Sequence, residues 1–112
     1  MLLKSKTEIP PGTLEMLILR TLKRSGPAHG YAIAKSIQQA SAEVLRVEEG
    51  SLYPALQRIL LKGWVTDEWV QAGPKRRNRI YRLTGEGRKR LDAEIGEYRR
   101  VSQAIARVIE PA

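Results

Sequence analysis

The sequence contains no cysteine and no phenylalanine, and its only histidine is His29. The absence of cysteine excludes disulfide bonds, thiolate zinc sites and a cysteine nucleophile. A catalytic triad or a metal site would need further partners beside the lone histidine, so we predict a non-enzymatic protein that holds no metal and no cofactor. A chain without cysteine also suits a reducing compartment, and we therefore expect a cytoplasmic location.

Long apolar runs are missing as well. No run of about eighteen consecutive apolar residues occurs, so no membrane-spanning helix is predicted. Residues 1–11 lack the apolar run and the cleavage site of a signal peptide, and we interpret them as a polar leader. With 112 residues and 5% aromatics, the chain has room for one domain with a modest aliphatic core. An oligomer interface would help to stabilise such a domain.

Positive charge is concentrated in one stretch. The formal net charge is +8 at pH 7, and the segment from Lys75 to Arg90 accounts for +7 of it, with eight basic residues against Glu86 alone. Because neighbouring like charges raise the local potential, this segment favours a polyanionic partner such as duplex DNA. A solvated basic surface without a partner is the alternative.

The first half of the chain predicts two helices and a short strand. Apolar residues at three- and four-residue steps predict a helix over residues 13–24, with Thr13 as its N-cap. A second helix is expected over residues 30–40, and a short strand within 44–47. The inward stripe of the second helix is predicted to be Ile33, Ile37 and Ala40.

A third helix is predicted over residues 51–62, followed by Gly63 as its end. Pro54 would lie in the first turn, where its missing N–H costs little. The inward face is predicted to consist of Leu52, Leu56, Ile59 and Leu60. Two strands, at about 64–71 and 79–83, would then enclose a basic loop and form a hairpin. Trp64 and Trp69 are an odd number of residues apart, so we place their side chains on opposite faces.

Thr84 is the expected N-cap of a long final helix with an apolar stripe. Either this stripe packs only on its own domain or it forms a dimer interface; the length of the helix favours the dimer. The residues assigned to dimerisation are Leu14 and Leu17 on the first helix and Leu91, Ile95, Tyr98, Val101, Ile105 and Val108 on the last.

This order of elements predicts a mainly α fold with a small β-hairpin. Three helices followed by a basic hairpin form a winged helix-turn-helix, whose third helix can enter the major groove while the hairpin lies on the adjacent backbone. We therefore divide the chain into a leader (1–11), a winged helix-turn-helix DNA-binding domain (12–83) and a C-terminal dimerisation helix (84–112).

Four short motifs carry a resemblance to a known family. They are GTLEMLIL at residues 12–19, HGY at 29–31, GSLYPAL at 50–56 and IYRLTGEGR at 80–88. Together, in this order and spacing, they resemble the PadR family of bacterial transcriptional regulators over residues 12–91. The single long helix after the hairpin is similar to the smaller size class of that family. One departure is Leu60-Leu61, where the family usually has a Leu-Glu pair.

The resemblance implies a sequence-specific transcriptional regulator, expected to be a repressor that binds an inverted-repeat operator as a homodimer. The alternative is a winged-helix module for protein or RNA contact without a specific operator. Members of the family often respond to small aromatic molecules. Leu14, Leu17, Tyr98 and Val101 could line such an effector site, although a filled interface without a cavity would need the same residues.

The candidate DNA contacts belong to the HGY motif, to the third helix and to the basic hairpin. Ser51 and Tyr53 can donate to phosphate oxygens, while Gln57 and Arg58 are long enough to reach base edges. Alternatively, Ser51 only caps the helix and Tyr53 packs on the core. The basic hairpin residues would contact the backbone or the minor groove. The full set is His29, Gly30, Tyr31, Ser51, Tyr53, Pro54, Gln57, Arg58, Lys75, Arg76, Arg77 and Arg79.

Overall fold

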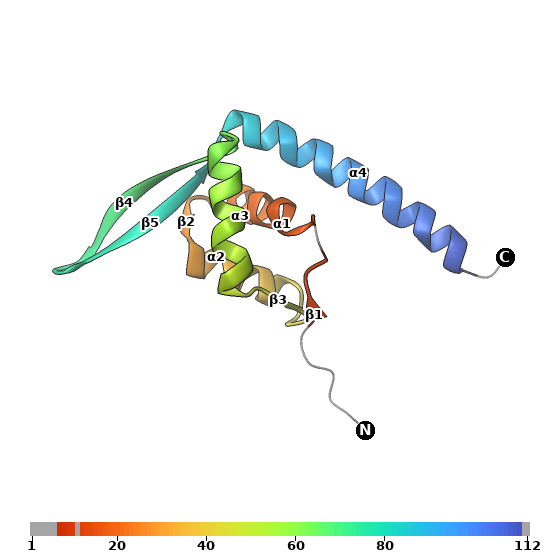
Figure 1. Cartoon of the computed structure of the whole chain (residues 1–112), viewed down its shortest axis with the longest axis horizontal. Coiled ribbons are helices and arrows are strands. Elements are labelled where there is room, and N and C mark those ends of the chain that lie inside the picture. The colour runs from red at the N-terminus through yellow and green to blue at the C-terminus, as the bar shows by residue number, and fades with distance from the viewer. Residues whose placement is uncertain (1–6, 11, 111–112) are drawn as a thin grey trace, which may run out of the picture.

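The computed structural model describes residues 7–10 and 12–110, which form four helices and five strands (Figure 1). Within these residues a three-helix domain carries a projecting hairpin on one side and a long helix on the other (Figure 1). In chain order the elements are β1 (Thr7–Glu8), α1 (Leu14–Ser25), β2 (Ala28–His29), α2 (Gly30–Ala40), β3 (Leu45–Arg46), α3 (Glu49–Leu61), β4 (Val65–Gly73), β5 (Arg76–Leu83) and α4 (Gly85–Ile109).

The core lies between α1, α2 and α3, with contributions from the hairpin and from the start of α4. Its buried side chains are Met16, Ile18, Leu19, Leu22, Ile33, Ile37, Leu52, Ala55, Leu56, Ile59, Val65, Tyr81 and Leu91. The predicted stripe of α2 is confirmed for Ile33 and Ile37 but is wrong for Ala40, which is exposed. Ala40 is the last residue of α2 and borders a groove beside α1, beyond the reach of the core.

Helix α1 confirms the predicted segment, but Thr13 does not cap it through its side chain. The Thr13 hydroxyl instead donates to the carbonyl oxygen of Pro10 at 2.8 Å. Ahead of α1, β1 pairs in parallel with β3, so the end of the predicted leader is a strand. Residues 1–6 and 11 of that leader lie outside the described residues.

Helix α3 begins two residues earlier than predicted. The extended backbone of Glu48 is its N-cap, and the Glu48 carbonyl accepts from the amide of Leu52 at 2.9 Å. Pro54 is consequently the sixth residue of the helix rather than part of its first turn, and it cannot donate the helical bond to the Gly50 carbonyl. The end is as predicted: Gly63 has a positive φ of 78°, which is the conformation that closes many helices.

The hairpin, which we call the wing, is longer than predicted. Strands β4 and β5 pair antiparallel as far as Gly73 and Arg76, with an irregularity after Gln71. Arg76 and Arg77 therefore lie in β5 and not in a loop, because cross-strand pairing continues to the Pro74-Lys75 turn. Strand β2 extends the wing by a third strand, since Ala28 pairs with Tyr81, and this ties the start of α2 to the wing.

Helix α4 begins as predicted, with the Thr84 hydroxyl accepting from the amide of Gly87 at 3.0 Å. Its first turns pack against α1, and its second half extends away from the domain (Figure 1). No helix within residues 7–10 and 12–110 has the length and hydropathy needed to cross a membrane.

Candidate nucleic-acid interface

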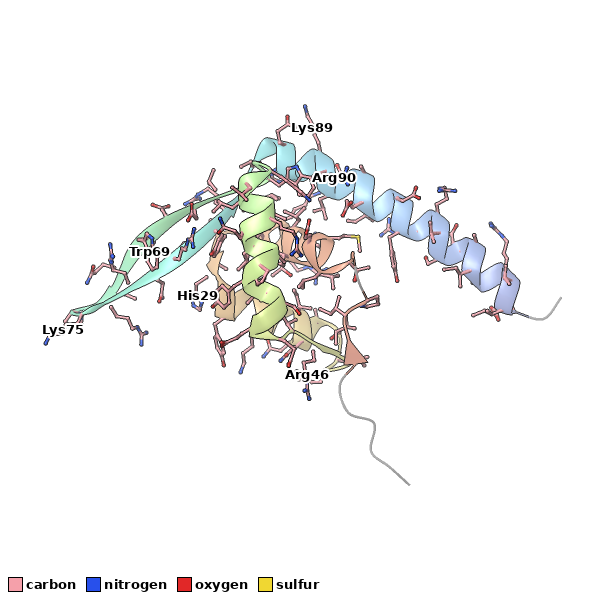
Figure 2. All side chains as sticks on the ribbon, viewed as in Figure 1. His29, Arg46, Trp69, Lys75, Lys89 and Arg90 are labelled. Carbon is pink, nitrogen blue, oxygen red and sulfur yellow. The ribbon has the colours of Figure 1, made fainter. Side chains whose placement is uncertain are left out.

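The start of α2, Tyr53 of α3 and one face of the wing border a groove of about 410 Å³, which we call the wing groove. It brings together six of the twelve residues predicted to contact DNA, and His29, Trp69 and Lys75 mark this side of the molecule in Figure 2. The residues that line it are His29, Gly30, Tyr31, Tyr53, Trp69, Arg76, Asn78, Arg79 and Tyr81.

The HGY motif shapes the floor of the wing groove. The Nδ1 atom of His29 accepts from the amide of Ala32 at 3.3 Å, so this side chain is the N-cap of α2. Gly30 is buried, and a Cβ atom there would lie 3.1 Å from the hydroxyl oxygen and from Cε1 of Tyr53. Gly30 therefore makes room for the Tyr53 ring, whose other side remains exposed to the groove.

Arg79 is held inside the groove by three neighbours. Its Nε atom donates to Asp67 Oδ2 at 2.5 Å, and its guanidinium lies 5.9 Å from the Trp69 ring and 5.5 Å from the Tyr81 ring. The hydrogen bond to Asp67 raises the pKa of Arg79. Burial raises the pKa of Tyr81, and the nearby charge of Arg79 partly opposes this effect. The charge of Arg79 is thus offset by Asp67, which leaves less of it for a polyanion.

The cations at the tip of the wing differ from Arg79, because no carboxylate of a described residue pairs with them. Lys75, Arg76 and Arg77 are exposed and form no ion pair with any described residue. Arg77 lies 5.2 Å from the Trp69 ring, so the indole supports one of these three side chains. Lys75 stands at the far end of the wing (Figure 2). The tip can therefore neutralise phosphates without first breaking an ion pair.

The other predicted contacts of α3 lie on its opposite side. Ser51, Pro54 and Arg58 border a second groove of about 420 Å³, the α3 groove, together with residues ahead of α1 and around β3. Gln57 is exposed. Because Glu48 is the N-cap, the alternative in which Ser51 only caps the helix is wrong.

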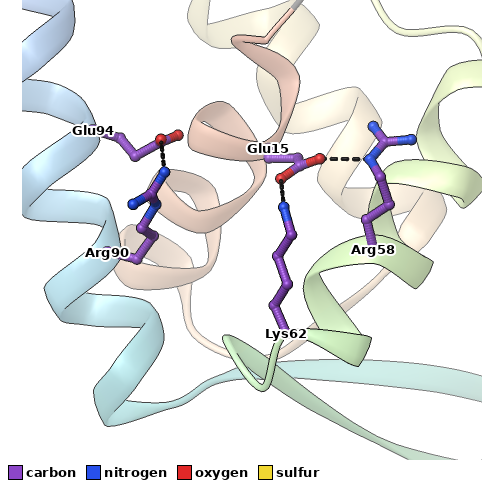
Figure 3. Close-up of polar contacts among 5 residues, drawn as sticks. All are labelled: Glu15, Arg58, Lys62, Arg90 and Glu94. Carbon is purple, nitrogen blue, oxygen red and sulfur yellow. Dashed lines mark hydrogen bonds and ion pairs between the residues drawn. The ribbon is translucent and has the colours of Figure 1, made fainter.

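Arg58 and Lys62 share one carboxylate. Arg58 Nε donates to Glu15 Oε2 at 2.6 Å, and Lys62 Nζ lies 3.4 Å from Glu15 Oε1 (Figure 3). Sequence reasoning missed Glu15 as a member of this surface, and it also missed Trp69, Asn78 and Tyr81 in the wing groove. The alternation of side chains along the two wing strands indicates which residues of one strand share a face. It does not give the register between the strands, which aligns Trp69 with Arg79.

The residues predicted for dimerisation divide by burial. Leu91 is 0% exposed in the core of its own chain, so its assignment to an interface is wrong. Leu14, Leu17 and Ile95 are partly buried against the same core. The exposed members of the stripe are Tyr98, Val101, Ile105 and Val108, and Ile109 extends it.

The four residues predicted for an effector site do not meet in one chain. Leu14 lines the α3 groove, Leu17 lines the groove between α1 and α2, and Tyr98 and Val101 are exposed on α4. A cavity built from all four would need a second copy of the chain. Among the described residues, no cluster of three or more acidic or histidine side chains could hold a metal ion.

The chain is similar in sequence and in structure to several known proteins. Residues 18–93 match the model of the transcriptional regulator PadR-like family. A PadR family transcriptional regulator from Eggerthella lenta is 30% identical, with a TM-score of 0.76 over 90% of this chain and 85% of that one. PadR of Bacillus subtilis, solved in complex with operator DNA, is 26% identical with a TM-score of 0.68, over 77% of this chain and 48% of that one.

A relative in sequence is a 37.1 kDa protein in transposon TN4556 of Streptomyces fradiae. It is 40% identical over 98 residues, which is 88% of this chain and 26% of that protein. The chain therefore spans about a quarter of the length of this relative.

Proposed function

Because the chain belongs to the PadR-like family of transcriptional regulators, we propose that it represses transcription by binding an inverted-repeat DNA operator as a homodimer. A family of transcription regulators agrees with the prediction of a non-enzymatic protein. The wing tip would contact phosphates and α3 would enter the major groove, as in other winged helix-turn-helix proteins. The operator complex of the similar Bacillus subtilis protein supports duplex DNA over RNA or a protein as the partner.

The observation that carries the proposal is the arrangement of donors and cations around α3. One groove lies on each side of the helix, and the exposed Gln57 and Arg58 belong to the helix itself. Contacts to phosphates position such a protein, whereas contacts to base edges give specificity. The cations of the wing tip, which pair with no described residue, suit the first task, and the long polar side chains of α3 suit the second.

The exposed stripe of α4 supports the proposed dimer. Tyr98 is 52% exposed and Val108 is 84% exposed, and their apolar surface would be covered by a second copy of the chain. A two-fold dimer presents two copies of α3, so the half-sites of the operator should lie about 10 bp apart or a multiple of that distance.

The primary experiment selects and sequences genomic DNA fragments retained by the purified protein. We expect one enriched motif with two-fold symmetry, and reduced transcription from a promoter that carries it when the protein is present. The absence of any enriched motif would contradict a specific operator. RNA that competes as well as duplex DNA in a gel shift would favour the alternative, an interaction module.

The wing tip can be tested apart from α3. Replacing Arg76 and Arg77 by Ala should weaken binding to every duplex and lower the slope of log K against log salt by about one for each lost phosphate contact. The matched control, Arg100→Ala with Arg107→Ala, removes two cations from α4 and should leave that slope unchanged. Equal slopes for the two double variants, measured by titration at several salt concentrations, would show that the wing tip does not contact phosphates.

A further inference from the structure

We propose that Glu15 is a positioning residue that determines which base pair α3 selects, because it holds Arg58 in one orientation. This inference rests on the proposed DNA-binding function. Glu15 belongs to α1 and reaches α3 across a separation of 43 residues in the sequence. Because Glu15 belongs to α1 and binds the Arg58 side chain, it would act through that side chain rather than on DNA directly.

The geometry ties the carboxylate to α3 at two points. Oε2 accepts from Arg58 Nε at 2.6 Å and Oε1 pairs with Lys62 Nζ at 3.4 Å (Figure 3). The side chain of Glu15 is only 17% exposed, whereas those of Arg58 and Lys62 are 53% and 47% exposed. Lys62 is the C-cap of α3 and follows Arg58 by four residues, so both side chains lie on the same side of the helix.

The position of Glu15 is itself determined by the core. It stands in the first turn of α1, directly before the buried Met16, and α1 packs against α3. Lys62 is also held from another direction, since its Nζ atom lies 4.5 Å from the Trp64 ring. The carboxylate is therefore an anchored group, and the exposed arginine is oriented by it.

Because Arg58 binds Glu15 through Nε, its two Nη atoms remain available to bind DNA. Neither Nη atom of Arg58 donates a hydrogen bond to a described residue, and the side chain borders the α3 groove. An arginine recognises guanine through two parallel hydrogen bonds to O6 and N7. Restricting the side chain before binding reduces the conformational entropy that this contact loses. Glu15 would thereby hold Arg58 in the one orientation in which its guanidinium can bind a particular base pair.

The chain offers a matched pair for comparison. Arg90 Nη2 and Glu94 Oε2 lie 2.9 Å apart, with the carboxylate 22% exposed and the arginine 48% exposed (Figure 3). This pair resembles Glu15–Arg58 in distance and burial but belongs to α4 alone. Glu94→Gln therefore measures what the loss of a similar surface ion pair does when α3 is not involved.

The test compares Glu15→Gln, Arg58→Ala and the double variant on the selected operator and on operators with single base-pair changes. We expect Glu15→Gln to lower discrimination at one base pair by about tenfold, within the range of a bidentate arginine–guanine contact. Affinity for random duplex should stay the same or rise, because a negative charge near the DNA is removed. Arg58→Ala should lose discrimination at the same base pair, and the double variant should lose no more.

Several outcomes separate this inference from its premise. Glu94→Gln should keep wild-type discrimination, and thermal unfolding of each variant checks that the fold persists. Should Glu15→Gln fail to fold, Glu15→Asp tests the same point, because aspartate keeps the negative charge in the first turn of α1 but its shorter side chain cannot reach Arg58 Nε and Lys62 Nζ as glutamate does. Full discrimination in Glu15→Gln, or in Glu15→Asp, would overturn the role of Glu15. A wild-type chain that prefers no duplex would instead refute the proposed function, and with it this inference.

Discussion

Tyr53 lies in the wing groove because Gly30 leaves space for its ring. The two residues belong to different helices, and the hydroxyl oxygen of Tyr53 would be 3.1 Å from a Cβ atom at position 30. The HGY and GSLYPAL motifs therefore contact each other, and the bulk of Tyr53 explains why a glycine occupies position 30. At the same scale, Asp67 determines the orientation of Arg79, and Glu15 determines that of Arg58.

The Gly30–Tyr53 contact gives a prediction that separates stability from DNA affinity. Gly30→Ala should leave the melting temperature nearly unchanged, because replacing glycine by alanine reduces the entropy of the unfolded chain, which stabilises the fold by about 0.4–1 kcal/mol, and the half-exposed Tyr53 ring can shift. The displaced ring should weaken DNA binding severalfold, measured by fluorescence anisotropy. Tyr53→Phe keeps the ring but removes the hydroxyl and serves as the comparison. Unchanged affinity in Gly30→Ala would mean that the position of Tyr53 does not matter for binding.

The wing is joined to α3 and α4 through one compact junction. The Thr84 hydroxyl donates to the Gly63 carbonyl at 2.8 Å, and the Thr84 amide donates to the Trp64 carbonyl at 3.1 Å. Trp64 lies between two cations, with Lys62 at 4.5 Å and Arg90 at 5.0 Å from its ring. The ends of α3 and β5 and the start of α4 are thus connected at this point.

Gly87 is the tightest position of this junction. A Cβ atom there would lie 2.1 Å from the Trp64 carbonyl oxygen and 2.8 Å from Leu83 Cδ1, and the first of these atoms is backbone. We expect Gly87→Ala to destabilise the fold by about 1–3 kcal/mol, measured by urea unfolding. Gly85 lies in the same turn with nothing near its Cβ position, so Gly85→Ala should not destabilise the fold. Equal stability of the two variants would contradict this account of the junction.

Helix α4 extends well beyond the part of it that packs on the domain. Its 25 residues span about 37 Å, but only Gly87 and Leu91 are buried within it. The exposed stripe continues to Ile109, and this distribution of apolar surface is what the proposed dimer would cover. Dimerisation through α4 would also set the distance between the two copies of α3.

We therefore expect Val101→Glu combined with Ile105→Glu to produce a monomer in analytical ultracentrifugation. Charged side chains in the proposed interface would lose water without gaining a partner, which opposes association. Gln103→Glu introduces a charge about half a turn away from Val101 and should remain dimeric. The monomer should bind operator DNA weakly, since each half-site then binds alone. A dimer that persists in the double variant would require another interface.

Features that depend on neighbours along the chain could be predicted from the sequence. Helix α2 begins and ends at the predicted residues, Thr84 caps α4, and Gly63 ends α3. Apolar spacing, caps and glycine conformation act within a few residues, so a linear pattern contains them. The winged helix-turn-helix order and the family resemblance followed from the same local signals.

Which distant residues share a surface depends on how the helices and strands pack, and the linear pattern does not contain this information. Strand register places Arg76 and Arg77 in β5 and brings Asp67 to Arg79, and register depends on pairing between strands rather than on either strand alone. Leu91 belongs to the core because α4 packs on α1 at that point, although its spacing is the same as that of the exposed stripe. Glu15 and Arg58 are 43 residues apart, and they meet only because α1 packs against α3.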